Sequence, residues 1–252
     1  MNYLYDQSFE GFLTCVYHHW YLEKADGIFH DGDYQLDLSR YAMTLETDEE
    51  KASRVMSAIT KKISESDARR VYQGFCSCVP EKEMKLLRYI ALGFAKGPKI
   101  RLLHGDPIVK AVEEAEGKVG LEVHRYCGLI RFSEMHDHGK GIIALYSKIE
   151  PDNDVLEFLA PHFSDRFKSE PFIIHDLKRR KALLALDRKW EIVSLSEEES
   201  AGLLDKTESE QDYAALWKEY FDVMATRERT NPRCQRNFMP VRYWKHLTEI
   251  SS

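Results

Sequence analysis

The order of apolar and polar residues along the chain predicts several helices interrupted by short strands. Ser8 offers a side-chain cap to the first helix, and Thr47 with Glu50 forms a capping box for the second. Weak strand candidates, LYD, IFH and YAMTL, lie around the first helix. Residues 48–105 are therefore expected to form a mainly helical part. From the spacing of apolar residues, the predicted helices cover about 8–21, 47–63, 66–77 and 81–95.

A change of period at Gly128 divides the second half of the chain. Asp106 is a capping residue followed by proline, and one apolar stripe continues from there to Tyr126, which predicts the longest helix. After Gly128 the pattern becomes extended, and LIRFSEM and IIALYSKI are typical of a hairpin. Asp152 then caps a further helix. Three strands follow it, PFIIHDL, KALLAL and WEIVSL, joined by short basic turns.

Two strands, a helix and three more strands predict an α+β fold: an antiparallel β-sheet with helices packed on one face and an inserted, mainly helical subdomain. Parallel strands would need longer crossovers between them. Ser196 and Glu199 repeat the capping-box pattern, and an amphipathic helix is expected over 213–227. We expect one domain over 1–252, made of the helical part at 48–105, a helix and the sheet at 106–195, and a C-terminal helix with a basic and aromatic arm at 196–252.

The composition is typical of a globular protein and not of an integral membrane protein. Of 252 residues, 43% are hydrophobic, and the mean hydropathy is -0.48. No apolar run approaches the ~20 residues of a membrane span. The start, MNYLYDQSFEGF, lacks the pattern of a signal peptide, and five scattered cysteines favour reduced thiols over a disulfide framework. We therefore expect a cytoplasmic protein with no membrane partner.

The formal net charge of -6 conceals opposite charges in two neighbouring segments. Residues 196–210 hold six acidic side chains and one lysine, whereas residues 227–246 hold six arginines and lysines and one glutamate. A local basic surface is what phosphate binding needs. The net charge therefore does not exclude a nucleic-acid partner.

The basic segment also carries aromatic residues, which gives it two possible roles. Arginines can bind phosphate, and aromatic rings can stack on unpaired bases. Alternatively, Tyr243 and Trp244 dock the arm on the core while the arginines form surface ion pairs. The candidate nucleic-acid-binding residues are Lys178, Arg179, Arg229, Arg233, Arg236, Arg242, Tyr243 and Trp244.

A second group of polar residues gives a candidate catalytic site in the middle of the chain. A histidine could act as general acid or base if a carboxylate orients it. His175 and Asp176 are neighbours on a strand and point to opposite faces, so they do not form a simple dyad. The alternative is a satisfied core histidine, with arginines paired to nearby carboxylates. The candidates are His124, Arg131, Glu134, His162, Arg166, His175 and Asp176.

The sequence contains no convincing set of metal ligands. His136 and His138 flank Asp137 in the predicted hairpin loop, where an exposed turn is the simpler interpretation. Cys76 and Cys78 lack a second pair of ligands at zinc spacing. We expect no metal and no cofactor.

Six segments together resemble a bacterial family associated with DNA repair and DNA metabolism that has been known as a domain of unknown function. The resemblance covers almost the whole chain in the same order. It rests on LYDQSFEGFLTCVY, TDEEKASRV, HRYCGLIRF, IEPDNDVLEFLAPHFSDRF, IIHDLKR and ERTNPRCQRNFMPVRYW.

The resemblance implies partners rather than catalytic residues. In that family the domain is typically encoded beside a radical-SAM protein associated with DNA modification or repair, and in other bacteria a similar domain is fused to a uracil-DNA glycosylase. The expected function is a DNA-binding accessory module that works with such a partner. The alternative is an enzyme that acts on nucleic acid or a nucleotide through the central histidine, arginine and acidic residues.

Overall fold

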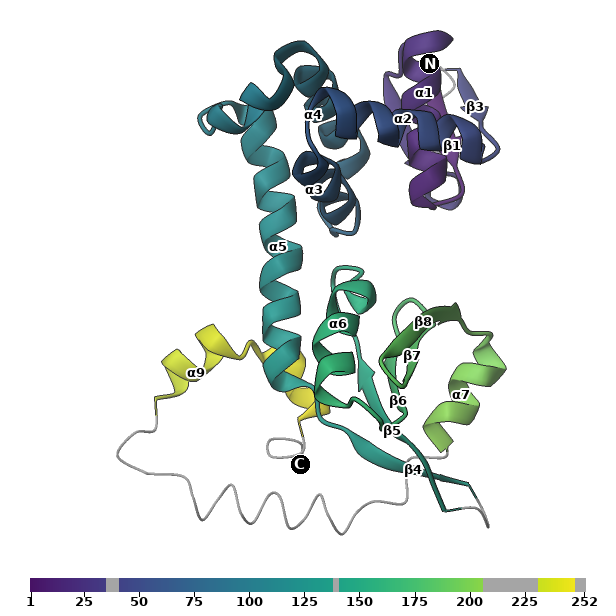
Figure 1. The fold of residues 1–252 in the computed structure, drawn as a ribbon, viewed down its shortest axis with the longest axis vertical. Helices are drawn as coiled ribbons and strands as arrows, with labels where there is room; N and C mark the ends of the chain where they lie inside the picture. The colour runs from purple at the N-terminus through teal and green to yellow at the C-terminus, as the bar shows by residue number, and fades with distance from the viewer. Residues whose placement is uncertain (35–40, 138–140, 206–230, 248–252) are drawn as a thin grey trace. The chain divides into compact units, whose positions relative to one another are not determined.

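The structure, a computed structural model, describes residues 1–34, 41–137, 141–205 and 231–247 (Figure 1). It divides into two compact units, Met1–Val119 and Gly120–Ser252, which are described separately. Helix α5 runs from Pro107 to Leu129 and contributes to both. That the whole chain acts as one domain stays a prediction.

The first unit opens with a three-stranded parallel sheet in the order β2-β1-β3. Every residue of β1 is buried, as expected for a central parallel strand that is covered on both faces. Helices α1 and α4 contact this sheet. The three weak strand candidates of the sequence are thus strands, with bounds β1 Asn2–Tyr5, β2 Gly27–His30 and β3 Ala42–Thr44.

Helices α1 to α4 share one core with this sheet, and three of them, α2 to α4, lie within the range 48–105 that was expected to be mainly helical. Their facing apolar residues form one core, in which Phe12, Ile59, Val71 and Ile90 have no exposed surface. Short 3-10 helices follow β2 and α4, at Asp31–Asp33 and Gly97–Leu102. The bounds are α1 Phe9–Tyr21, α2 Glu49–Lys62, α3 Glu65–Phe75 and α4 Lys82–Lys96.

Helix α1 is capped as predicted, but α2 is not. Ser8 Oγ accepts a hydrogen bond from the Gly11 amide at 2.9 Å, whereas α2 is capped by Asp48, which accepts from the Lys51 amide. The Thr47 hydroxyl instead donates to Asp6 at 2.8 Å, which ties the start of α2 to the end of β1. Thr47 was the wrong cap because α2 begins one residue later than predicted, at Glu49, which puts Asp48 in the capping position.

The second unit contains a five-stranded sheet in the order β4-β5-β6-β7-β8. Helix α5 continues through Gly128, so this glycine does not end the helix as predicted, and β4 begins only at Ser133. The bounds are β4 Ser133–Asp137, β5 Gly141–Ile149, α6 Leu156–Arg166, β6 Phe172–Asp176, β7 Lys181–Leu186, β8 Lys189–Ser194, α7 Glu197–Asp205, α9 Pro232–Phe238 and a 3-10 helix at Val241–His246.

This sheet is mixed, so the prediction of an antiparallel sheet was wrong for one strand pair. β5 and β6 run parallel, whereas the other three pairs are antiparallel. Helix α6 lies between β5 and β6 in the chain and provides the crossover that a parallel pair requires. Its first residue is Leu156 and it has no side-chain cap, so Asp152 does not cap it as predicted.

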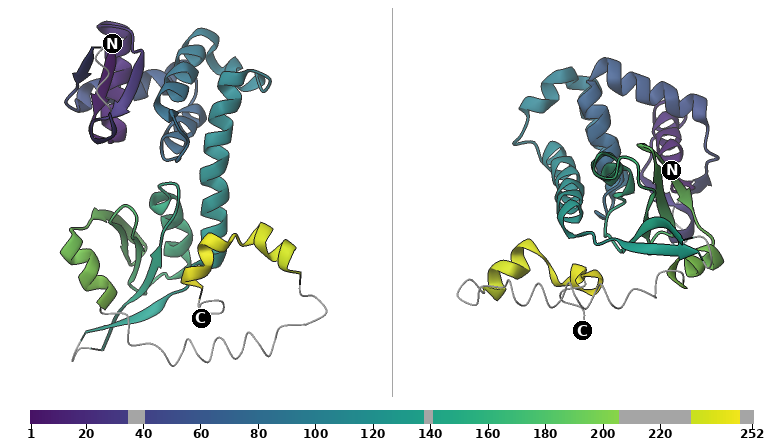
Figure 2. Two further views of the ribbon diagram at one scale, coloured as in Figure 1. Left: turned by 180° about the vertical axis from the view of Figure 1, so that it is seen from behind. Right: turned by 60° about the horizontal axis from the view of Figure 1, so that its bottom comes forward.

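Helices cover both faces of the sheet rather than one (Figures 1 and 2). Phe172 of β6 packs against Phe163 of α6, and α6 contacts β7 and β8. His175 lies three residues after Phe172 on β6 and therefore points to the opposite face, where it is hydrogen-bonded to Ser200 of α7. Leu203 and Leu204 of α7 pack against the sheet on that face.

Among the described helices, none is long and apolar enough to cross a membrane. The amphipathic helix predicted at 213–227 lies outside the described residues, as does His138 of the hairpin loop.

Candidate functional site

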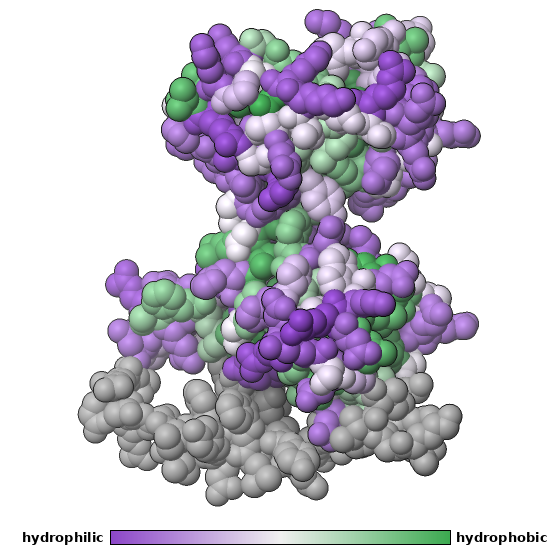
Figure 3. Space-filling model, in the orientation of Figure 1, coloured by the Kyte–Doolittle hydropathy of each residue, from purple (hydrophilic) through white to green (hydrophobic). Residues whose placement is uncertain are grey.

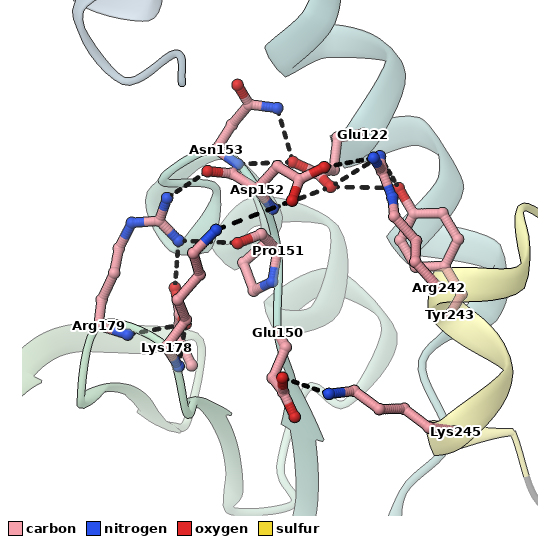
Figure 4. Close-up of polar contacts among 11 residues, drawn as sticks. Glu122, Glu150, Pro151, Asp152, Asn153, Lys178, Arg179, Arg242, Tyr243 and Lys245 are labelled. Atoms are coloured by element: carbon pink, nitrogen blue, oxygen red, sulfur yellow. Dashed lines mark hydrogen bonds and ion pairs between the residues drawn. The ribbon is translucent and has the colours of Figure 1, made fainter. Parts of the chain in front are cut away.

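The C-terminal arm is anchored to a buried carboxylate that no sequence motif identified. Glu122 of α5 is 1% exposed and accepts three hydrogen bonds from the loop before α6. They come from the Asp152 amide at 3.2 Å, the Asn153 amide at 2.8 Å and the Asn153 side chain at 2.6 Å (Figure 4). Glu122 therefore fixes that loop against α5.

Arg242 and Tyr243 reach the same carboxylate from the arm (Figure 4). Arg242 Nη2 lies 3.1 Å from Glu122 Oε1, and its Nη1 pairs with Asp152. The Tyr243 hydroxyl donates to Glu122 at 3.2 Å, and its ring, 4% exposed, meets Tyr126 edge-on. For Tyr243 this is the docking arrangement that the sequence left open.

The end of the arm is held by a second carboxylate, Glu150. Lys245 pairs with it, and His246 Nε2 lies 3.3 Å from it. Burial acts to raise the pKa of Glu150, but Lys245 and His246 outweigh this effect and hold that pKa below its ordinary value. Trp244 is half-buried and donates its indole N–H to the Met239 carbonyl at 2.9 Å.

The basic turn after β6 is organised by Asp176, which has no exposed surface. Asp176 accepts from the backbone amides of Lys178 and Arg179, and Arg179 Nη1 lies 3.0 Å from it. Burial raises the pKa of Asp176, and the Arg179 guanidinium opposes this rise. Arg179 also donates to the carbonyls of Pro151 and Asp152, whereas Lys178 stays exposed.

His175 lies at the centre of a buried chain of hydrogen bonds. Its Nδ1 is 2.9 Å from the Tyr146 hydroxyl and its Nε2 is 3.0 Å from the Ser200 hydroxyl. Burial lowers the pKa of His175. A neutral imidazole has one donor and one acceptor nitrogen, so one hydroxyl donates to the ring and the other accepts from it.

The other catalytic candidates do not gather around His175. His124 is exposed on α5, and His162 and Arg166 are exposed on α6. Arg131 precedes β4 and donates to the carbonyls of Gly128 and Ile130, and Glu134 is half-buried on β4. These positions do not define a common cleft.

Helix α9 presents its side chains to solvent along its whole length. Asn231 caps it by accepting from the Cys234 amide at 3.0 Å, and none of its residues is buried. Arg233 and Arg236 are exposed and form no ion pair within the described chain, and Phe238 is 77% exposed. The α9 region shows both hydrophilic and apolar residues in Figure 3. Arg229 lies outside the described residues.

The sequence did carry a signal for Glu122. The glutamate falls three residues after Val119 and four before Tyr126, both of which belong to the apolar stripe of α5. A carboxylate in a buried stripe requires polar partners. That signal indicates an internal anchor, but it does not name Arg242 as the partner.

No group of three or more potential ligands that could hold a metal occurs among residues 1–34, 41–137, 141–205 and 231–247. The side chain of His136 and all of His138 lie outside the described parts. The absence of a metal thus stays a prediction.

Comparison with known proteins gives a family without an assigned activity. No curated protein and no solved structure matches the chain significantly. Residues 80–249 match DUF4130, described as a domain of unknown function. Because this match spans more than half of its 252 residues, the chain belongs to the DUF4130 family.

Proposed function

We propose that this protein is a DNA-binding accessory module and that α9 is its contact surface. One observation carries the proposal: α9 is a helix with no buried residue, yet the 3-10 helix that follows it, Val241–His246, is anchored through Arg242 and Tyr243. A helix that contributes nothing to the core keeps its side chains available for a partner.

The chemistry of the exposed side chains favours a polyanionic partner. Arg233 and Arg236 are three residues apart and so lie on the same side of α9. No acidic residue occurs between Asn231 and His246. Phosphate contacts by such arginines supply the sequence-independent part of DNA affinity.

The anchoring contacts exclude some of the candidate residues from the proposed DNA-contact surface. Arg242, Arg179 and Lys245 each have a carboxylate partner within the protein. Phosphate contacts by these three would require their ion pairs to open. The proposed surface therefore consists of Arg233 and Arg236, with Phe238 beside them.

The partner follows from the resemblance described above. A module that binds DNA without chemistry of its own delivers its substrate to a separate enzyme, and a radical-SAM or uracil-DNA-glycosylase protein is the partner that the resemblance implies. The enzymatic alternative has less support, because His175 has no exposed surface and His124 and His162 stand on different helices.

Replacement of both α9 arginines tests the proposal. Arg233→Ala with Arg236→Ala should weaken binding to a 20-base-pair duplex and reduce the slope of log affinity against log salt by about 1.8, since each lost phosphate contact removes about 0.9. Fluorescence anisotropy at four salt concentrations measures both quantities.

A matched control removes the same charge elsewhere in the second unit. Lys168 and Lys189 are exposed and form no ion pair within the described residues, so Lys168→Ala with Lys189→Ala should leave the salt slope unchanged. An equal loss in both double variants would indicate a general charge effect and contradict the role of α9. A wild-type protein without salt-dependent affinity would contradict the whole proposal.

A further inference from the structure

The first unit contains a groove whose lining combines aromatic rings with cations. Six side chains define this aromatic groove: Tyr17, Trp20 and Tyr21 of α1, Arg54 and Lys62 of α2, and Phe94 of α4. Its volume is about 390 Å³, within the range of ligand-binding pockets. The lining includes no acidic residue.

The rings of the groove are unusually open for aromatic residues. Tyr21 is 71% exposed and Trp20 is 42% exposed. Tyr17 and Tyr21 stack with their centroids 4.4 Å apart, and Trp20 meets Phe94 edge-on at 5.5 Å. The rings thus support one another while leaving accessible faces, and burial in the core does not explain Trp20 or Tyr21.

The cations lie against these rings and have no carboxylate partner within the described chain. The Arg54 guanidinium is 5.6 Å from the Tyr17 centroid, and Lys62 Nζ is 5.4 Å from the Phe94 centroid. Exposed cation–π contacts are weak, whereas a base stacked on an aromatic ring contributes more. Both cations are therefore free to turn towards phosphate when bases occupy the rings.

We infer that this aromatic groove binds single-stranded nucleic acid through base stacking and phosphate contacts. Duplex bases are already stacked on one another, so rings of this kind select unpaired bases. Arg54 and Lys62 are eight residues apart on α2, a rise of about 12 Å. That distance spans three to four nucleotides of a stacked strand at roughly 3.4 Å each.

Charge distinguishes this groove from a second cavity of the same unit. The cavity beside β2 and α4 is lined by three carboxylates, Asp26, Glu81 and Glu83, and by two cations, Lys82 and Arg88. Its acidic groups oppose the attraction of its cations for phosphate, whereas the charged side chains that line the aromatic groove are all positive. A polyanion with unpaired bases is the ligand class that matches both properties of the aromatic groove.

The experiment measures binding of the full chain to a labelled 20-mer of thymidylate. Arg54→Ala with Lys62→Ala should reduce the salt slope by about 1.4, since a single-strand contact contributes about 0.7. Trp20→Ala should weaken binding roughly tenfold to a hundredfold. Fluorescence anisotropy gives both values, and far-ultraviolet circular dichroism confirms that each variant is folded.

Two controls match these changes in type but lie outside the groove lining. Lys61 precedes Lys62 on α2 and points about 100° away, and Tyr41 is 87% exposed. Lys61→Ala and Tyr41→Ala should bind the 20-mer as the wild type does. Equal weakening by the groove variants and their controls would overturn the inference, as would unchanged binding by all of them.

The inference rests on the proposed nucleic-acid-binding function, and the two fail differently. If only the α9 variant loses affinity for either probe, the groove inference is wrong and the function stands. If only the groove variants lose affinity for the 20-mer, the groove binds single strands and α9 is not a contact surface. A wild type that binds neither probe contradicts both.

Discussion

Replacement of Glu122 by alanine should destabilise the second unit by about 3–5 kcal/mol, the range for removing one partner of a buried ionic network. The carboxylate is 1% exposed, and its loss would leave the amides of Asp152 and Asn153 without their acceptor. Arg242 and Tyr243 would also lose their shared partner. Chemical denaturation measures the free energy of unfolding.

Amide hydrogen exchange shows which part of the chain loses stability in Glu122→Ala. Amides of residues 231–247 should exchange faster in Glu122→Ala, because the arm loses its buried anchor. Glu114→Ala makes the same change at an exposed position of α5 and should alter stability by less than about 0.5 kcal/mol. Unchanged protection of the arm in Glu122→Ala would show that Glu122 does not anchor it.

Replacement of Asp67 by alanine should destabilise the first unit by about 2–3 kcal/mol. Asp67 is 1% exposed and accepts hydrogen bonds from the Tyr89 hydroxyl at 2.7 Å and Arg101 Nε at 3.1 Å. Tyr89 is fully buried, so its hydroxyl would keep only the weaker contact with Arg70. Thermal and urea unfolding of the variant measure the loss.

The same substitution has a predictable pH dependence. Burial acts to raise the pKa of Asp67, but hydrogen bonds from Ser64, Tyr89 and Arg101 outweigh it, so the folded-state pKa lies below its ordinary value. The contribution of Asp67 is therefore full above about pH 4, the unfolded value, and is lost as the pH falls through the lower, folded value. The stability difference between wild type and Asp67→Ala should narrow at low pH. A difference that grew as the pH fell would contradict this assignment.

The two substitutions together also test the prediction of a single domain. If Asp67→Ala accelerates exchange only within 1–119 and Glu122→Ala only within 120–252, the units unfold independently. Acceleration of both ranges by either variant would support one cooperative domain.

The helices were predictable from the sequence because their signals are local. Ser8 and the Ser196 with Glu199 pair cap helices as expected, and the apolar stripe of α4 places its bounds within one residue. Whether two paired strands run parallel or antiparallel is not determined by a local signal in the sequence. Nothing in IIALYSKI or PFIIHDL states whether these strands pair with each other, and their parallel pairing depends on the passage of α6 across the sheet.

The site was also less predictable than the helices, because its contacts join residues that are far apart in the sequence. Tyr243 is buried because it meets Glu122 and Tyr126, over a hundred residues earlier in the chain. The composition of the arm fits docking and DNA contact equally well. Only the positions of the carboxylates separate Arg242, which pairs with Glu122 and Asp152, from Arg233 and Arg236, which form no ion pair with a described residue.

The core of the first unit has a consequence for the evolution of this family. The family match begins at residue 80, but Leu86 and Ile90 of α4 share a core with Phe12 and Ile59, which precede that point. A chain cut at residue 80 would expose the apolar face of α4, and we expect it to aggregate or to bind a hydrophobic dye. Relatives that retain only the matched region can be stable only if another segment or another protein covers that face. In this protein the matched region therefore begins inside a folding unit, and the residues before it supply the cover for α4.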